Sequence, residues 1–430
     1  MDVLTNPNIL ELRRLLNFPY QLYLVGGAVR DFVLMKESKD LDFATNLSCE
    51  EMAVRLQGNG AQFYLTGLKH NTITVLVNGT PLEVTTFRDA DCTIEGDLAL
   101  RDFTMNAMAI HAPSGEFLDP FSGRSDLAWG VIRFIPCENP FEKDPLRILR
   151  MIRFSATLGF RIHRGCLSDA AFTAHLLLNV SPERIRDELV KILVSDRPKE
   201  AFIKMYNLGI LEAILPELAS GAGIVQNSYH NEDVLDHILS VVENIPNDPI
   251  LRLAALFHDI AKPQCVTTDE RGDRHFLRHE DVGAEMTKEI MGRLKSSNEE
   301  IEKVSKLVAL HMRPVIGLTP RGRRRLIKDC GELLPEFFEL KNADRKAHTN
   351  PEPLDEFLEA VEEVYKERDR KDVPNFRTLA IGGKDLLEIG FVQGPEIGKM
   401  LKHLEEMVLE DPEINQREML LLTAVVEKEI

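Results

Sequence analysis

Several features that mark secreted and membrane proteins are missing from this sequence of 430 residues. It contains no run of about 18 uncharged apolar residues, which a membrane helix requires. Its first residues lack the basic region, apolar core and cleavage site of a signal peptide. The six cysteines are widely scattered without a CxxC pair, which argues against a zinc ribbon or a disulfide framework. We therefore expect a soluble cytoplasmic protein with free thiols and no membrane partner.

Basic residues are also fewer than acidic ones: the chain has 52 Lys and Arg and 69 Asp and Glu, which gives a net charge of −17. Such a deficit argues at first against a nucleic-acid partner, since the phosphate backbone is bound through Lys and Arg. Two local clusters of basic residues could nevertheless bind nucleic acid. The alternative for each cluster is a solvated helix face or an ion-pair network. The clusters are Arg147, Arg150 and Arg153, and then Arg321, Arg323, Arg324, Arg325 and Lys328.

The chain is organised around residues 22–42, where a short apolar run is followed by two glycines and two nearby aspartates. The run 22–25 predicts a buried strand, and Gly26 and Gly27 allow a tight turn close to a ligand. Asp40 and Asp42 would point to one face of an extended strand. Paired carboxylates beside a glycine turn suggest a Mg²⁺ ion bound together with nucleotide phosphates. The alternative is an ordinary pair of surface acids.

Downstream patterns predict a hairpin and then a long helical region. The Asn78-Gly79 turn separates two strand-like runs, and Glu83 on the second could complete a three-carboxylate metal site. Residues 101–109 look like a buried helix that carries charge, which is expensive unless it serves a site. The segment 144–160 predicts a helix with apolar and Arg faces, and Asp144 before a proline could be its cap.

We place a domain boundary near residues 221–223. In the hundred or so residues after it, histidines and aspartates recur and suggest a second type of site. A lone histidine is more often a packed or surface residue. Six such residues in order favour a site, and the pair His258-Asp259 ends an apolar helical run that can fix metal ligands. The six are His237, His258, Asp259, His279, His311 and Asp344.

Five ordered segments of the first half resemble the class II tRNA nucleotidyltransferase and poly(A) polymerase family, the CCA-adding enzymes. They read LVGGAVRD, DLDFAT, LEVTTFR, RDFTMNAMA and DPLRILRMIRFSATLGF. The resemblance implies that Asp40 and Asp42 bind two catalytic Mg²⁺ ions, with Glu83 beside them. It implies that the nucleotide is bound by Gly26, Gly27, Arg30, Arg101, Asp102, Asn106 and Arg150. It also implies that Asp144 and Arg147 pair with the incoming base edge, as a carboxylate acceptor beside a guanidinium donor can do.

The second half resembles the HD phosphohydrolase superfamily over residues 229–347. That resemblance makes His237, His258, Asp259 and Asp344 the principal ligands of a divalent metal, with His279 and His311 available for a second ion or for phosphate. The identity of the metal stays open, because mixed imidazole and carboxylate ligands suit several ions. The implied activity is that of a phosphodiesterase or phosphatase.

Two departures from the family pattern bear on which nucleotide is added. Leu100 stands where the family commonly has a second arginine, so one phosphate contact is expected to be missing. The connection between Glu83 and Arg101 is shorter than in full-length CCA-adding enzymes. Because the longer loop is associated with the switch from CTP to ATP, the short connection favours addition of CC only.

These observations predict an α+β protein: a polymerase-β-like nucleotidyltransferase head with a mixed sheet (1–140), an all-helical neck (141–220), an HD domain (221–350) and an RNA-binding helical tail (351–430). We expect tRNA, CTP and ATP as partners and no DNA. Three alternatives remain at this point. They are a poly(A) polymerase, an HD phosphohydrolase whose head only binds RNA, and a non-enzymatic RNA-binding scaffold.

Overall fold

The computed structural model describes residues 4–17, 19–38, 40–67, 71–136, 140–225, 232–270, 274–371 and 374–429. Cys137 and the first residues of the HD-like stretch, 229–231, lie outside them. The chain divides into one unit formed by Met1–Ile192 and Ile203–Ile214 and a second formed by Leu193–Phe202 and Leu215–Ile430. No described helix is both long enough and apolar enough to cross a bilayer.

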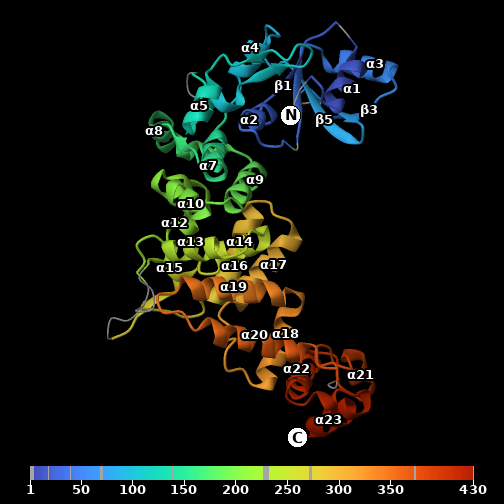
Figure 1. The fold of residues 1–430 in the computed structure, drawn as a ribbon. Coiled ribbons are helices and arrows are strands. Elements are labelled where there is room, and N and C mark those ends of the chain that lie inside the picture. Colours follow the sequence, from blue (N-terminus) through green and yellow to red (C-terminus); the bar gives the residue numbers. More distant parts are fainter. Residues whose placement is uncertain are drawn as a thin grey trace. The chain divides into compact units, whose positions relative to one another are not determined.

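The first unit contains a seven-stranded mixed sheet of order β3-β4-β5-β2-β1-β6-β7, drawn in the blue and cyan part of Figure 1. Its strands are β1 (Leu22–Val25), β2 (Asp42–Thr45), β3 (Gln62–Gly67), β4 (Thr72–Val77), β5 (Thr80–Thr86), β6 (Ala109–His111) and β7 (Phe117–Leu118). The helices before and among them are α1 (Pro7–Leu16), α2 (Gly27–Val33), α3 (Cys49–Gly58), α4 (Ile94–Ala99), the 3₁₀ turn η2 (Thr104–Asn106) and α5 (Gly123–Trp129).

The sheet's register carries the predicted acids into neighbouring positions. β2 runs parallel to β5, and Asp42 lies opposite Glu83. β1 runs antiparallel to both β2 and β6, so the strand before the glycine turn is central. The core on this side packs Val25, Ala44 and Phe87 against Ile94 and Leu98 of α4.

Two expectations for this unit need correction. β2 begins at Asp42, so Asp40 precedes the strand and the alternation argument for a shared face does not apply to it. Residues 101–109 form no helix but the 3₁₀ turn η2 followed by the start of β6. The reason is that Ala107 and Ala109 are buried in the core beside β1, and a short fully buried run has no periodicity that separates helix from strand.

Where the structure describes it, the rest of the first unit is mainly helical, with a two-stranded ladder of β8 (Val131–Ile132) and β9 (Arg161–Ile162). The helices are α6 (Pro140–Lys143), α7 (Arg147–Leu158), α8 (Arg164–Thr173), η3 (Ala174–Asn179), α9 (Pro182–Leu193) and α11 (Ile210–Ile214), while α10 (Pro198–Asn207) divides between the units. α7 has the predicted amphipathic character, with Ile148, Leu149 and Ile152 buried. The predicted α+β class is confirmed.

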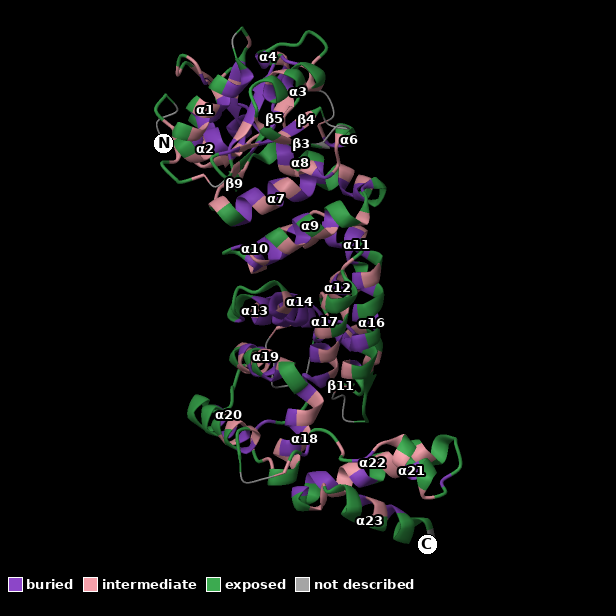
Figure 2. Cartoon of the chain, turned by 90° about the vertical axis from the view of Figure 1, so that its right-hand side faces the viewer, coloured by how far each residue is buried: buried purple, intermediate pink, exposed green. Residues whose placement is uncertain are grey.

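In its described residues, the second unit is a helical assembly with one small antiparallel strand pair, β10 (Val266–Thr268) and β11 (Arg274–Phe276). Its helices are α12 (Pro216–Ala219), α13 (Val234–Asn244), α14 (Pro249–Phe257), α15 (Lys262–Cys265), α16 (His279–Arg293), α17 (Asn298–Leu310), α18 (Pro320–Cys330), η4 (Gly331–Leu333), α19 (Leu334–Ala347), α20 (Leu354–Arg368), α21 (Gly383–Glu388), α22 (Pro395–Glu410), η5 (Pro412–Ile414) and α23 (Arg417–Glu429). α14 packs against α13, α17 and α19, and its residues from Leu251 onward are buried (Figure 2). It is the central helix of this unit.

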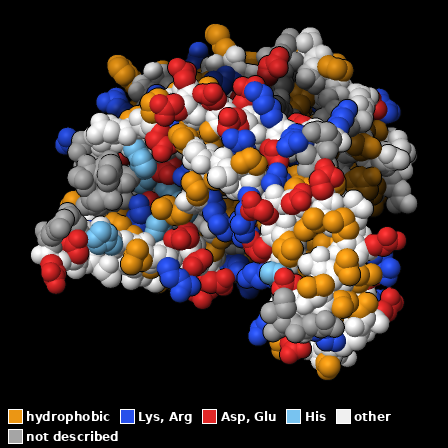
Figure 3. Space-filling view, turned by 90° about the horizontal axis from the view of Figure 1, so that it is seen from below, with side chains coloured by type: hydrophobic (Ala, Val, Ile, Leu, Met, Phe, Trp, Pro, Cys, Tyr) orange, Lys and Arg blue, Asp and Glu red, His pale blue; other side chains and the backbone are white. Residues whose placement is uncertain are grey.

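The basic cluster on α18 forms ion pairs with α20 and α22. Arg324 is buried, lies 2.7 Å from a carboxylate oxygen of Glu367 and donates to the carbonyls of Leu409 and Glu410. The other members pair with acids in the same way: Arg321 with Glu406 and Glu410, Arg323 with Glu363, Arg325 with Glu406, and Lys328 with Glu405. Figure 3 shows acidic side chains interspersed with Lys and Arg on the face it presents. The ion-pair interpretation of this cluster therefore holds.

Candidate active site and metal centre

A cleft of about 500 Å³ in the first unit gathers most residues that the sequence predicted for a nucleotide site. Its predicted lining residues are Gly26, Gly27, Arg30, Asp42, Arg101, Asp102, Asn106, Asp144, Arg147 and Arg150. Four further lining residues, Arg88, Leu100, Arg153 and Phe154, were not in that set. Asp40 and Glu83 are exposed and are not among the lining residues.

The glycine turn brings the backbone close to the charged side chains of the cleft. Gly26 has φ +68°, a conformation that side chains rarely adopt, and a Cβ there would lie 3.0 Å from Nη1 of Arg101. Gly27 begins α2, which carries Arg30 one turn later. Arg30 is held by Asp31 at 2.7 Å and donates to the side-chain oxygen of Asn106 at 3.1 Å. Sequence reasoning correctly required glycine at this turn.

Buried acids fix the arginines that face the cleft. Asp97 on α4 is almost fully buried and accepts hydrogen bonds from Arg101 at 2.9 and 3.2 Å. Asp102 is also buried, lies 2.6 Å from Arg150 and accepts from Asn106 and from the backbone N–H of Phe103. Burial acts to raise the pKa of Asp102, but Arg150 and these hydrogen bonds outweigh it and lower the pKa. The arginines are thus held in place before any ligand binds.

Asp42 has the opposite electrostatic environment. Burial, and then the charges of Glu83 and Asp40, raise its pKa, although Arg101 and Arg88 act against the rise. Carboxylates that destabilise one another in this way are stabilised by a cation, and oxygen ligands suit Mg²⁺. The residues therefore fit a divalent ion at Asp42. The three acids are not drawn into one tight cluster, since among the described residues such clusters occur only in the second unit.

The neck residues of the cleft come from α7 and the segment before it, and α9 holds them. Arg147 donates to the carbonyl of Leu100 at 2.8 Å. Asp144 does not cap α7, whose first turn has no side-chain cap; its carboxylate accepts from Arg184 at 3.2 and 3.3 Å. Buried Glu188 lies 2.7 Å from Arg153, which stacks over the ring of Phe154.

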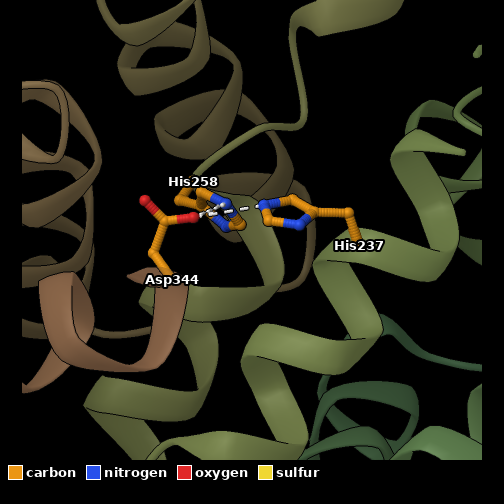
Figure 4. A group of neighbouring side chains, drawn as sticks. All are labelled: His237, His258 and Asp344. Carbon is orange, nitrogen blue, oxygen red and sulfur yellow. Dashed lines mark ion pairs between the residues drawn. The ribbon is translucent and has the colours of Figure 1, made fainter. Parts of the chain in front are cut away.

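All six histidines and aspartates predicted in the second half lie together in the second unit. They form two groups, His237, His258 and Asp344, and then Asp259, His279 and His311, whose ligand atoms lie within 4.8 Å of one another in each group. Asp259 links the groups, because its two oxygens lie 3.2 Å from Nε2 of His258 and 3.2 Å from Nε2 of His279. Figure 4 shows His237 and His258 directed at the carboxylate of Asp344.

The ring orientations of three histidines are those of metal ligands. Nδ1 of His258, His279 and His311 each faces the carbonyl of the residue three positions earlier, at 2.8, 2.6 and 2.6 Å. A carbonyl can only accept, so Nδ1 carries the proton and the Nε2 lone pair points into the cluster. Burial lowers the pKa of His237 and of His311, which favours the neutral form that binds metal. This donor set fits one or two divalent ions.

Comparison with known proteins finds similarity in both halves of the chain. Family models match as the poly A polymerase head domain over residues 22–133, the probable RNA and SrmB-binding site of polymerase A over 159–221, and the HD domain over 227–372. The A-adding tRNA nucleotidyltransferase of Deinococcus radiodurans is 32% identical and covers 90% of this chain and 92% of its own. The CC-adding enzyme of Thermus thermophilus is 33% identical over 90% of this chain and 89% of its own.

The chain belongs to the tRNA nucleotidyltransferase family. The resemblance drawn from the sequence is therefore confirmed. The fold agrees as well: the Bacillus stearothermophilus CCA-adding enzyme, solved in complex with CTP, matches 100% of this chain and 98% of its own with a TM-score of 0.73 at 24% identity.

In this tRNA nucleotidyltransferase, the residues missed by sequence reasoning are mostly arginines and the acids that hold them. Arg88 follows β5, and its backbone N–H donates to Asp97. Arg153 was predicted only as a member of the basic cluster with Arg147 and Arg150, whose spacing places the three on nearly the same helix face. Asp97 had no signal in the sequence, since an aspartate in a short polar connection reads as an exposed turn residue.

Proposed function

We propose that this chain adds nucleotides to the 3′ end of tRNA, by attack of the terminal 3′-hydroxyl on the α-phosphate of CTP or ATP with release of pyrophosphate. The observation that carries the proposal is the convergence of ten predicted nucleotide-site residues on one cleft. Relatives that span about nine-tenths of the chain and carry the same activity in their names support it.

The charge of the cleft suits a triphosphate. Its described lining includes six arginines and three aspartates, so cations predominate even though the whole chain is acidic. Arg30, Arg101 and Arg150 are each fixed by a carboxylate, which leaves further guanidinium donors for phosphate oxygens. The backbone at Gly26 and Gly27 can approach those oxygens because no side chain intervenes.

Asp42, with Asp40 and Glu83 near it, would hold Mg²⁺. When bound, the ion supplies Lewis-acid stabilisation of the charge that develops on the phosphates. The chain's own contribution is to place Asp42 at the start of β2, opposite Glu83 of β5 and beside the phosphate-binding turn. Asp144 and Arg147, both on the cleft wall, would select the base by pairing with its edge.

The connection between β5 and α4 supports addition of CC rather than the full CCA end. It is short and tied down, because Asp89 accepts from the backbone N–H of Thr93 at 2.9 Å and from its hydroxyl at 3.0 Å. Gly96 permits this contact, since a Cβ there would lie 2.2 Å from Oδ2 of Asp89. Addition of the terminal A is the second candidate, favoured by the similarity to the A-adding relative.

The lengths of the tRNA products distinguish addition of CC from addition of the terminal A. Purified protein is incubated with tRNAs that end at the discriminator base, at C and at CC, with CTP and ATP separately and together. We expect two cytidines on the first substrate and no growth of the third. Addition of A to the CC end would replace the CC assignment, long A tracts would indicate a poly(A) polymerase, and no addition to any tRNA would contradict the proposed function.

The second unit is proposed to hydrolyse phosphoesters at its histidine–aspartate cluster, with a divalent ion polarising the phosphate when bound. The six inward-facing ligands support this proposal. We further propose four functional divisions, namely a head (1–140), a base-selecting neck (141–220), the HD domain (221–350) and a tail that contacts tRNA (351–430).

A further inference from the structure

A small cavity beside the histidine–aspartate cluster is not accounted for by the metal ligands. It has a volume of about 150 Å³ and is lined by the C-terminal part of α19, the segment after α17 and the start of α20. Its polar lining comes from Lys341, Asp344, Arg345, His348 and Glu352, and its apolar lining includes Val315 and Phe357. Because Asp344 belongs both to the cavity wall and to the cluster, the cavity adjoins the candidate metal centre.

His348 extends the cluster into this cavity. It follows Asp344 by one helical turn, and its Nε2 lies 3.4 Å from Oδ1 of Asp344. The same oxygen lies 3.2 Å from Nε2 of His237, and the rings of His237 and His348 are 5.7 Å apart. His348 is about one-third exposed, whereas His237 is buried. A ligand in the cavity would therefore meet His348 first and the cluster behind it.

The cations of the cavity form no close ion pair with its two acids, although Glu352 also lines it and the charge of Lys341 helps to lower the pKa of Asp344. Among the described residues, neither Lys341 nor Arg345 has a carboxylate oxygen within ion-pair distance, in contrast to the fully paired basic residues of α18. Arg345 is nevertheless held in place, because it donates to the carbonyl of Glu352 at 2.8 Å and to the side chain of Asn342 at 3.0 Å and lies over the ring of Phe357. A fixed cation with only neutral partners is well suited to bind an anion.

The size of the cavity limits the anion. Pockets for whole small-molecule ligands are usually about 300–1,000 Å³, so 150 Å³ accommodates a phosphate group and little more. We propose that Lys341, Arg345 and His348 form a phosphate-binding entrance to the histidine–aspartate cluster. This entrance would bind the phosphate group on the terminal ribose of an RNA. This inference deepens the proposed phosphohydrolase function and rests on it for the substrate class.

Phosphate binding tests the entrance independently of hydrolysis. Full-length protein loaded with Mn²⁺ is titrated with inorganic phosphate in a calorimeter, with CTP present at saturation to occupy the arginine-lined cleft. We expect Lys341→Met to weaken phosphate binding about tenfold, the effect of losing one charged contact, and Arg345→Gln to act in the same direction. The matched control is Lys346→Met, which removes an exposed charge from the same helix outside the cavity.

The inference is overturned if phosphate does not bind the wild-type protein, or if Lys341→Met and Lys346→Met have equal affinities. Metal content is measured in each variant, and loss of Mn²⁺ from Lys341→Met would assign the effect to the cluster and also overturn the entrance. In a parallel assay with a ribose 2′,3′-cyclic phosphate, we expect the KM to rise about tenfold with the phosphate Kd. Intact phosphate binding without any hydrolysis by the wild type would instead reject the phosphohydrolase and retain the anion site.

Discussion

Gly26 combines a strained backbone conformation with a close approach to a functional side chain. Its φ is +68°, and the Cβ of an alanine would lie 3.0 Å from Arg101, which is itself tied to Asp97. Gly26→Ala should cost about 1–3 kcal/mol of stability, the usual range for a residue in a sparsely populated backbone region, and displace Arg101 from the phosphate path. We expect the KM for CTP to rise about tenfold, equivalent to 1.4 kcal/mol of lost binding, as measured by steady-state kinetics.

Gly60 provides the matched control for this prediction. Its φ is +70°, but no atom lies within 4 Å of the position that a Cβ would occupy. Gly60→Ala should therefore lower the Tm as Gly26→Ala does and leave the KM for CTP unchanged. An equal rise of KM in both variants would show that backbone strain alone, and not contact with Arg101, explains the effect.

At the level of single residues, the sequence predicted where site residues lie on the backbone better than it predicted which charged partners their side chains have. It required glycine at residue 26, and the register of β2 and β5 places Glu83 beside Asp42 as anticipated. It did not predict that Asp97 would be buried against Arg101, because the partner of an acidic residue depends on the packing of α4 onto the sheet. Conformation follows from residue type, whereas a charge partner follows from the tertiary fold.

At the level of elements, the basic face of α18 contains a buried and an exposed arginine with different roles. The side chain of Arg324 is 7% exposed and satisfies Glu367 and two backbone carbonyls, whereas that of Arg321 is 46% exposed. Arg324→Met removes the buried partner of Glu367 and leaves this carboxylate only Arg370 at 3.4 Å, so it should lower the free energy of unfolding by about 3–5 kcal/mol. Arg321→Met should change it by at most about 1 kcal/mol.

Urea unfolding followed by circular dichroism measures both changes. A loss of similar size in the two variants would show that the buried pair is no more important than the exposed one. A marked fall in tRNA affinity in the folded Arg321→Met variant would show that this face binds RNA despite its ion pairs. The first result bears on packing and the second on function, so the two readouts are independent.

The sequence predicted the type of an element correctly where the periodic segment was long. The predictions failed where the segment was short. The amphipathic pattern of α7 and the apolar run of α14 gave the correct helices, because more than two turns define a face. Residues 101–109 do not form the predicted helix, because most of this short segment is buried and has no periodicity that separates helix from strand. The ladder of β8 and β9 has two residues per strand, too few for any alternation to be visible.

At the scale of the molecule, the chain carries two separate sets of catalytic-type residues, one in each structural unit. Asp42 lines the cleft of the first unit, and His258 belongs to the cluster of the second. Both sets were predicted from the sequence alone, because the residues of each set lie within the sequence motifs and the motifs occur in the expected order. The ring orientations that make the histidines suitable ligands required the structure, since they depend on backbone carbonyls.

The two-site arrangement predicts that the activities can be lost separately. Asp42→Ala should lower nucleotide addition about a thousandfold, because metal-assisted charge stabilisation is worth several kcal/mol, and should leave phosphoester hydrolysis unchanged. His258→Ala should abolish hydrolysis and spare addition. Glu95→Ala and His275→Ala, which replace exposed residues in the same two units, should spare both activities. If either site variant retained the wild-type Tm and lost both activities, the two reactions would depend on one site and the model of independent centres would be wrong.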